Sequence, residues 1–200
     1  MLALLFLLFP LSLFASHPAS CEVYFSPQDQ VAQKLIELID QETSSIKVAI
    51  YSMTHLGIGK ALIRAKERGV DVQVIVDPFS VKIRSSVNQL AAADIPLFVW
   101  DQNLQMKGEQ TARRQRRALM HDKFCILGNR LVWTGSFNFT NDATQRHQEN
   151  VVTIDSREVA AKYKAQFDQM RLYGCRSLIE YKDLYPRKSK KAENIPASKL

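Results

Sequence analysis

Two basic side chains, His121 and Lys123, stand two residues apart in a run of strand-forming residues. On an extended strand this spacing directs both side chains to the same face. Burying a lysine without a partner is costly, so the pair is unusual for a hydrophobic core. An anionic group held between the imidazole and the ammonium would resolve the conflict, and the pair therefore indicates an anion-binding site.

A second group of polar residues follows Lys123 along the chain. Gly135 permits a turn or a close backbone approach. Ser136 and Asn138 share a face if the segment is extended, and their hydroxyl and carboxamide complement Lys123 as donors to phosphate oxygens. Glu149 comes later, just before another apolar run. The residue types together predict chemistry on a phosphate group.

The stretch from residue 121 to residue 150 resembles the single-motif branch of the phospholipase D superfamily. The pattern of that family is His-x-Lys, four residues, Asp, six residues, Gly-Ser and then Asn, with a later acidic residue. The chain matches this pattern at His121, Lys123, Gly135, Ser136, Asn138 and Glu149. The upstream text AIYSMTHLGIGKALIRAKERGVDVQVIVD resembles the first half of the family domain. The chain is similar to small bacterial endonucleases and to the mitochondrial cardiolipin-hydrolase or piRNA-nuclease branch.

The resemblance implies a metal-independent phosphodiesterase that hydrolyses its substrate through a phosphohistidine intermediate and needs two histidines. Because the chain carries one motif, it implies a homodimer with the active site at the subunit interface and His121 from each copy. Lys123, Ser136 and Asn138 would bind the phosphoryl oxygens. Glu149 would bond to the far nitrogen of His121. No metal and no other cofactor is expected.

One position departs from the family pattern, because the motif acid falls at residue 128, which is Gly. The acid is neither the nucleophile nor a phosphate ligand in the family, so we expect the chemistry to survive, with Gly128 starting a tight turn. The alternative is a non-catalytic module that keeps the fold and binds nucleic acid or membrane.

The net charge of +7 is concentrated in two segments, residues 101–120 and 182–200. This placement favours a polyanionic partner, either nucleic acid or anionic phospholipid. Four arginines just before the motif are candidates for binding the polyanion backbone: Arg113, Arg114, Arg116 and Arg117. Our preferred interpretation is an endonuclease of low sequence preference acting on DNA or RNA. The alternative is a phospholipase D that degrades phosphatidyl lipids to phosphatidate.

The chain divides into three parts. Residues 1–20 form an apolar signal peptide or N-terminal anchor, residues 21–176 the catalytic domain, and residues 177–200 a basic tail that we expect to be disordered. The leader predicts export to the periplasm or the exterior, with anchoring through the N-terminus or a lipidated Cys21 as alternatives. Export also permits a disulfide between Cys21 and Cys175.

The alternation of strands and helices predicts one α/β domain, a mixed sheet flanked by helices on both faces. The expected strands are residues 22–25, 46–53, 70–77, 97–100, 119–127, 131–134 and 151–154, and the expected helices are 28–43, 58–68, 81–93 and 156–173. Gly128-Asn129 predicts a two-residue hairpin turn, and residues 101–120 a long loop. Ligand sites in such folds gather at strand ends.

Two other histidines lie in the expected domain. His55 follows a strand end, where it could line the cleft, but an ordinary loop histidine is the simpler interpretation. His147 lies close to Glu149, and two such residues without a third at a suitable spacing are weak grounds for a metal site.

Overall fold

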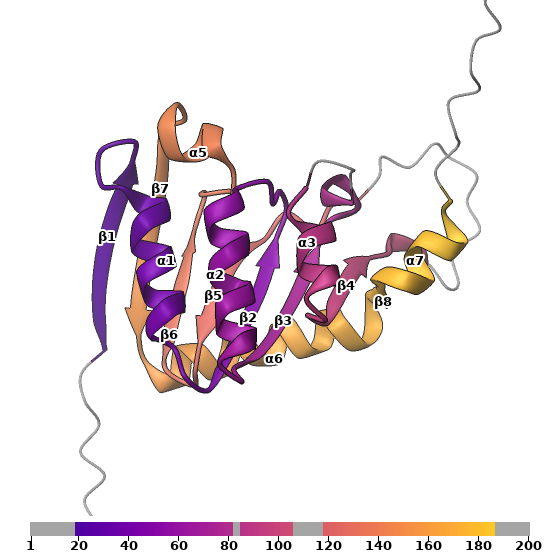
Figure 1. The fold of residues 1–200 in the computed structure, drawn as a ribbon. Helices are drawn as coiled ribbons and strands as arrows, with labels where there is room; N and C mark the ends of the chain where they lie inside the picture. Colours follow the sequence, from indigo (N-terminus) through magenta and orange to yellow (C-terminus); the bar gives the residue numbers. More distant parts are fainter. Residues whose placement is uncertain (1–18, 82–84, 106–117, 187–200) are drawn as a thin grey trace, which may run out of the picture.

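The protein is described by a computed structural model that covers residues 19–81, 85–105 and 118–186. One eight-stranded mixed sheet runs through the molecule in the order β1-β7-β6-β5-β2-β3-β4-β8 (Figure 1). The strands are β1 (Ser20–Ser26), β2 (Ser45–Ile50), β3 (Asp71–Val76), β4 (Leu97–Trp100), β5 (Lys123–Leu127), β6 (Leu131–Gly135), β7 (Glu149–Asp155) and β8 (Cys175–Ser177).

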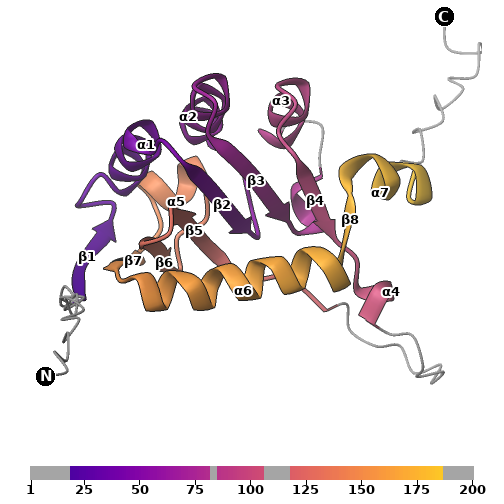
Figure 2. The same ribbon diagram turned by 90° about the horizontal axis from the view of Figure 1, so that it is seen from below.

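Helices lie on both faces of this sheet, as the sequence predicts. One face is covered by α1 (Val31–Gln41), α2 (Leu56–Glu67) and α3 (Val87–Ala92), and α6 (Arg157–Tyr173) crosses the other face (Figure 2). The remaining helices are short: η1 (Pro78–Ser80), α4 (Gln102–Gln105), α5 (Asn141–Gln145) and α7 (Leu178–Leu184).

The strand directions bring several chain segments together at one end of the central strands. Strands β2, β3 and β4 are parallel, whereas β5 pairs with β2 in the antiparallel sense, with Lys123 opposite Ile50. The residues that follow β2 and β3 therefore lie next to those that precede β5. We call this the His121 edge, formed by residues 51–55, 77–80, 120–123 and 135–140.

The core has two layers, one on each side of the sheet. Helix α1 places Val31, Leu35 and Ile39 against the sheet because their spacing lines one helical face. Helix α6 buries Phe167 and Met170 against the opposite sheet face. The alternation of side chains along β5 serves both layers, and this two-sided burial holds the strand that carries Lys123.

Several predicted boundaries are shifted by local backbone geometry. Helix α1 begins at Val31 because Gln30 takes a left-handed conformation (φ 50°). Helix α3 begins at Val87, after η1, and residues 82–84 lie outside the described part. The hairpin loop has three residues instead of two, since Leu127 pairs with Leu131 and Gly128 takes φ 60°.

The predicted start of the disordered tail at residue 177 is wrong. Ser177 caps α7 through a reciprocal capping box with Glu180, and Leu178 is buried. Ordered structure therefore continues at least to residue 186. Residues 187–200 lie outside the described residues, and so do residues 1–18 of the leader.

The three cysteines are free, and Cys21 and Cys175 cannot meet within one chain. Cys21 lies on β1 and Cys175 on β8, which are the opposite edges of the sheet. Seven strand spacings of about 4.8 Å separate them. Cys125 is buried, as expected, and burial raises the pKa of its thiol.

The predicted loop at residues 101–120 begins with the short helix α4, and its basic portion, residues 106–117, lies outside the described part. None of the helices in the described ranges has the length and apolar character needed to cross a bilayer.

A methyl group at Gly135 would disturb the sheet next to the segment that carries His121 and Lys123. A Cβ there would fall directly on the backbone carbonyl oxygen of Asn150 in the neighbouring strand. We expect Gly135→Ala to lower the free energy of unfolding by about 2 kcal/mol or more, because the obstacle is backbone and cannot rotate away. Urea denaturation will measure this. Gly69→Ala controls for backbone strain, since Gly69 also has a positive φ (88°) but its Cβ meets nothing within 4 Å; a loss in Gly135→Ala no larger than in Gly69→Ala would contradict the explanation.

Candidate active site

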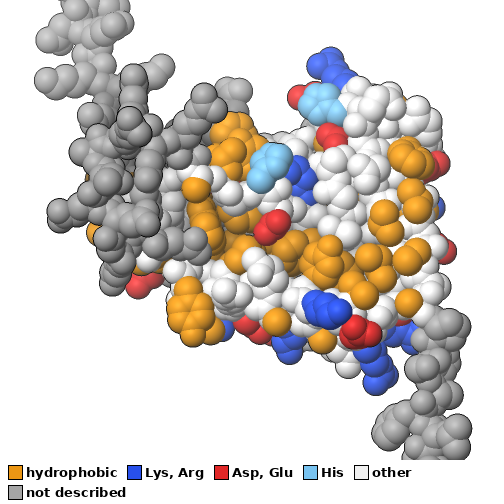
Figure 3. Space-filling view, turned by 180° about the vertical axis from the view of Figure 1, so that it is seen from behind, with side chains coloured by type: hydrophobic (Ala, Val, Ile, Leu, Met, Phe, Trp, Pro, Cys, Tyr) orange, Lys and Arg blue, Asp and Glu red, His pale blue; other side chains and the backbone are white. Residues whose placement is uncertain are grey.

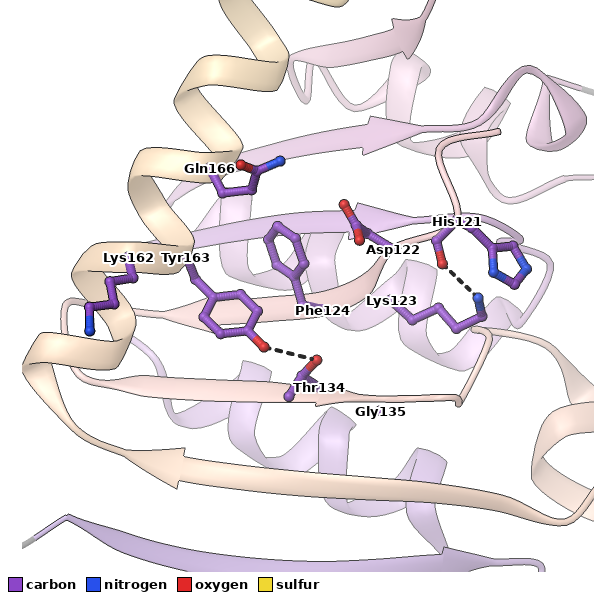
Figure 4. Close-up of a pocket in the computed structure, with 9 residues that line it drawn as sticks. All are labelled: His121, Asp122, Lys123, Phe124, Thr134, Gly135, Lys162, Tyr163 and Gln166. Atoms are coloured by element: carbon purple, nitrogen blue, oxygen red, sulfur yellow. Dashed lines mark hydrogen bonds between the residues drawn. The ribbon is translucent and has the colours of Figure 1, made fainter. Parts of the chain in front are cut away.

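The predicted basic pair lies in one open pocket on the α6 side of the His121 edge. The pocket has a volume of about 410 Å³ and is lined by His121, Lys123 and Gly135 together with residues of α6 (Figure 4). His121 precedes β5, so the pair is not presented by regular strand geometry as predicted. Instead the Lys123 ammonium donates a hydrogen bond to the His121 carbonyl oxygen at 2.7 Å and holds the turn.

An aromatic stack supports both members of the pair. The ring of Tyr51, just after β2, lies 4.8 Å from the His121 ring at 62°, an edge-to-face contact. The Lys123 nitrogen lies 5.5 Å from the centroid of the same ring, within the range of a cation–π interaction. Phe79 stacks on Tyr51 at 5.2 Å. The sequence analysis missed Tyr51, although its position at a strand end was a usable signal.

A buried carboxylate fixes the chain immediately before His121. Asp77 follows β3, is fully buried, and accepts hydrogen bonds from the backbone N–H of Phe79 at 2.7 Å and of Met120 at 3.1 Å. The neighbouring Tyr51 N–H donates to the Asp122 carbonyl oxygen at 3.0 Å. The residues that follow β2 and β3 therefore position the segment that carries His121.

The surroundings of Lys123 shift the pKa of its ammonium in two opposite directions. Burial in the pocket lowers the pKa of its ammonium, and the nearby negative charges of Glu149 and Asp122 offset part of that effect. Asp122 is affected in the opposite sense, since burial raises the pKa of its carboxyl. A bound phosphate would add a further negative charge beside Lys123 and offset more of the cost of burying its ammonium.

Ser136 and Glu149 form a separate pair across β6 and β7. The Ser136 hydroxyl donates to the Glu149 carboxylate and accepts from the Asn150 N–H at 3.1 Å. The other oxygen of Glu149 lies 3.7 Å from Nδ1 of His147. Among the described residues, Glu149 makes no hydrogen bond to His121 of the same chain, and its carboxylate bonds Ser136 and approaches His147 instead.

Asn138 occupies the loop between β6 and α5 that completes the edge. Its backbone carbonyl accepts from the Thr140 N–H at 2.8 Å. Its side-chain oxygen is buried and has no hydrogen-bond partner among the described residues. An unsatisfied buried acceptor of this kind costs about 1–3 kcal/mol, so the amide is an incomplete part of the site.

The segment that carries these residues matches a known protein family. A family model described as cardiolipin synthase, PLD-like domain matches residues 35–171. The chain belongs to the phospholipase D superfamily.

Relatives and solved structures agree with this assignment. A Rickettsia felis protein named phospholipase D is 31% identical over 140 residues, which are 70% of this chain and 63% of that protein. The mitochondrial cardiolipin hydrolase of Xenopus tropicalis is 26% identical over 172 residues, 86% of this chain and 74% of that protein. The match thus spans less than two thirds of the Rickettsia relative.

Two solved structures share the fold over almost their whole length. Nuc from Salmonella typhimurium, a phospholipase D family member, is 32% identical with a TM-score of 0.65, covering 80% of this chain and 97% of that one. NucT from Helicobacter pylori is 26% identical with a TM-score of 0.70, covering 80% and 99%.

The missing phospholipase D acid at Gly128 has a local structural explanation. A Cβ at this position would lie 3.1 Å from a carboxylate oxygen of Glu42. Glu42 accepts hydrogen bonds from the backbone N–H of Ser44 at 2.7 Å and of Thr43 at 3.0 Å. A carboxylate from another part of the chain therefore stands beside the motif position. Gly128 also lies at the end of β5 opposite Lys123, about 17 Å along the strand.

The other candidates divide between described and undescribed parts of the chain. Arg113, Arg114, Arg116 and Arg117 lie outside the described residues. His55 caps α2 by accepting the Ile58 N–H at 3.2 Å, so it has a structural role. Within residues 19–81, 85–105 and 118–186, no group of three or more His, Cys, Asp or Glu side chains is arranged to hold a metal.

Replacing Asp77 tests its role in holding the histidine segment. We expect Asp77→Asn to lose about 1–3 kcal/mol of stability, because a carboxamide opposes one of the two N–H donors with its own NH₂ group. Activity should fall as well, because the Met120 backbone is released. Chemical denaturation and an activity assay check this, with exposed Asp71→Asn as the control. Wild-type stability in Asp77→Asn would refute the assigned role.

Lys123→Met should separate stability from activity. The folded-state pKa of Lys123 is lowered, so the unfolded chain binds more protons and wild-type stability rises with pH across that interval. The variant removes this titration, so its urea midpoint relative to wild type should be most favourable at pH 7, while activity is lost. The difference should move in favour of wild type as the pH rises through the lowered pKa. A difference that does not change between pH 7 and pH 10 would contradict this.

Proposed function

We propose that this phospholipase D superfamily member is a metal-independent nuclease that hydrolyses phosphodiester bonds of DNA or RNA. The observation that carries the proposal is the joint placement of His121 and Lys123 in one open pocket, on an aromatic support. A nucleophile and a cation beside it suit a phosphoryl group, which needs an attacking atom and charge stabilisation.

In the proposed reaction a nitrogen of His121 attacks phosphorus and displaces one ester oxygen. That leaving oxygen takes a proton from a second histidine, and a phosphohistidine remains. Water, deprotonated by the same second histidine, then attacks phosphorus and breaks the P–N bond. Lys123 and Asn138 would stabilise the charge on the phosphoryl oxygens. The free phosphate-ester product leaves, and both histidines return to their starting states.

The second histidine is proposed to be His121 of another copy of the chain. Glu149 of its own chain makes no hydrogen bond to the ring among the described residues, because it bonds Ser136 and approaches His147. In a two-fold symmetric dimer, each copy would present the same half-site to the other. The Glu149 carboxylate has acceptor sites beyond its Ser136 bond, and one of these would accept from the histidine of the opposite copy.

The α6 face of the sheet offers a surface for this dimer. Of the helices in the described residues, α6 is the one long helix that crosses that face, and hydrophobic side chains spread over it beside a hollow at its upper margin (Figure 3). Val23 and Phe25 on the edge strand β1 are each 53% exposed. Exposed apolar groups gathered on one face of a soluble domain commonly mark an interface.

Nucleic acid is favoured as the substrate by the charge of the chain. Its 27 lysines and arginines exceed its 20 acidic residues, and four of the arginines directly precede the motif. Phosphate contacts by such side chains provide most of the affinity of sequence-independent nucleic-acid binding. Hydrolysis of phosphatidyl lipids is the second candidate, favoured by relatives named phospholipase D and cardiolipin hydrolase.

The decisive assay uses the full chain with EDTA present. Single-stranded DNA, duplex DNA, RNA and phosphatidyl-lipid vesicles are tested in parallel with wild type, His121→Ala and, as a charge control, exposed Lys60→Met. We expect nucleic-acid cleavage by wild type and Lys60→Met, and a loss of at least about 10³-fold in His121→Ala. Turnover of vesicles alone would transfer the proposal to the lipase, and no turnover on any substrate would reject both enzymes.

A further inference from the structure

A second cavity lies at the His121 edge, on the side of the sheet away from α6. It is open to solvent, has a volume of about 490 Å³ and is bordered by the starts of α1 and α2 and by α5, which lie side by side in Figure 1. Three glutamines line it, and we call it the glutamine pocket after them: Gln30, Gln33 and Gln145. Its size is typical of a site for a small organic group.

The described lining of the glutamine pocket has more apolar than polar surface, and it includes no acidic, lysine or arginine side chain. The amides of Gln30 and Gln145 offer donors and an acceptor, the Gln33 amide keeps one donor and its acceptor beside its bond to Glu37, and Thr144 adds a hydroxyl. Ala32, Ile36 and Pro27 provide apolar surface between them. This combination does not suit a phosphate or a charged lipid headgroup, which needs cations. It suits a flat, uncharged ring with hydrogen-bonding edges.

His55 adds a donor of fixed orientation. Its Nδ1 accepts the Ile58 N–H at 3.2 Å, which places the proton of the neutral ring on Nε2. Burial lowers the pKa of the imidazole, so the ring is neutral near pH 7. His55 therefore contributes one N–H donor and no charge, consistent with the rest of the lining.

The pocket is directly connected to the catalytic segment. The Phe139 carbonyl oxygen accepts the N–H groups of Thr54 and His55, each at 2.8 Å. Phe139 follows Asn138, and Thr140 caps α5, which carries Thr144 and Gln145. One short piece of chain thus leads from the active-site loop into the pocket wall.

The backbone at the pocket rim is also unusual. Gln30 takes a left-handed conformation, which costs free energy for a residue with a side chain. It stands at the start of α1, yet its amide makes no capping hydrogen bond. Gln33 donates to Glu37 at 2.9 Å, and this bond holds its side chain along α1.

We propose that the glutamine pocket binds one nucleobase of a single-stranded substrate whose phosphodiester lies at His121. Amide side chains match the donor and acceptor edges of bases, as glutamine does with adenine. A base paired and stacked in a duplex cannot enter such a pocket, so the site selects unpaired strands. The proposal rests on the nuclease function proposed above and adds the part of the substrate that is recognised.

The test compares two single-stranded oligonucleotides of equal length and charge, one with bases and one with abasic spacers throughout. Wild type, Gln33→Leu and Gln145→Leu are assayed as full chains, and Gln41→Leu, at the other end of α1, is the matched control. We expect kcat/KM for the base-containing strand to fall about tenfold in both pocket variants. Cleavage of the abasic strand should not change, and Gln41→Leu should match wild type on both.

A binding measurement distinguishes failure of the pocket from failure of the nuclease. Adenosine and cytidine are titrated into the full chain while the side-chain amide NMR signals of Gln33 and Gln145 are followed. Shifts without nucleic-acid cleavage would keep the pocket and reject the nuclease. Wild-type cleavage that is insensitive to both pocket substitutions, with no amide shift, would overturn the pocket and leave the nuclease intact.

Discussion

The His121 edge depends on one buried side chain, Asp77, whose carboxylate accepts hydrogen bonds from two backbone N–H groups. One of those groups belongs to Met120, directly before His121, and the other to Phe79, which stacks on Tyr51. The same carboxylate therefore holds the histidine segment and the aromatic support of its ring. Burial makes this arrangement rigid, because a lost acceptor would leave two donors without a partner inside the protein.

Among the described residues, the site at the His121 edge holds only some of the groups that a phosphodiesterase needs. The proposed nucleophile and the cation lie together, but Glu149 bonds Ser136 and approaches His147, and the side-chain oxygen of Asn138 has no partner in the described part of the chain. These features fit a half-site that a second copy completes. The apolar α6 face beside the pocket gives the proposed dimer its surface.

Much of the fold and the centre of the site could be predicted from the sequence. Periodic apolar positions identify α1 and the central strands. His121 and Lys123 line one pocket, but not through the strand spacing that predicted it, because His121 precedes β5. The orientation of Glu149 could not be predicted, because it depends on how β6 and β7 bring Ser136 and His147 to the same carboxylate. The contribution of Tyr51 depends similarly on the pairing of β2 with β5. The helix after Ser177 was readable from its capping box and was missed because the basic residues beyond it dominated the composition.

The central claim is that one site uses His121 from two copies, and mixed dimers test it most directly. Wild type and His121→Ala, carrying different tags, are produced together in equal amounts, and total activity is compared with an all-wild-type preparation. A shared site predicts about a quarter of the activity, because only dimers with two wild-type copies are competent. An activity of about half would mean that each chain acts alone and would contradict the account.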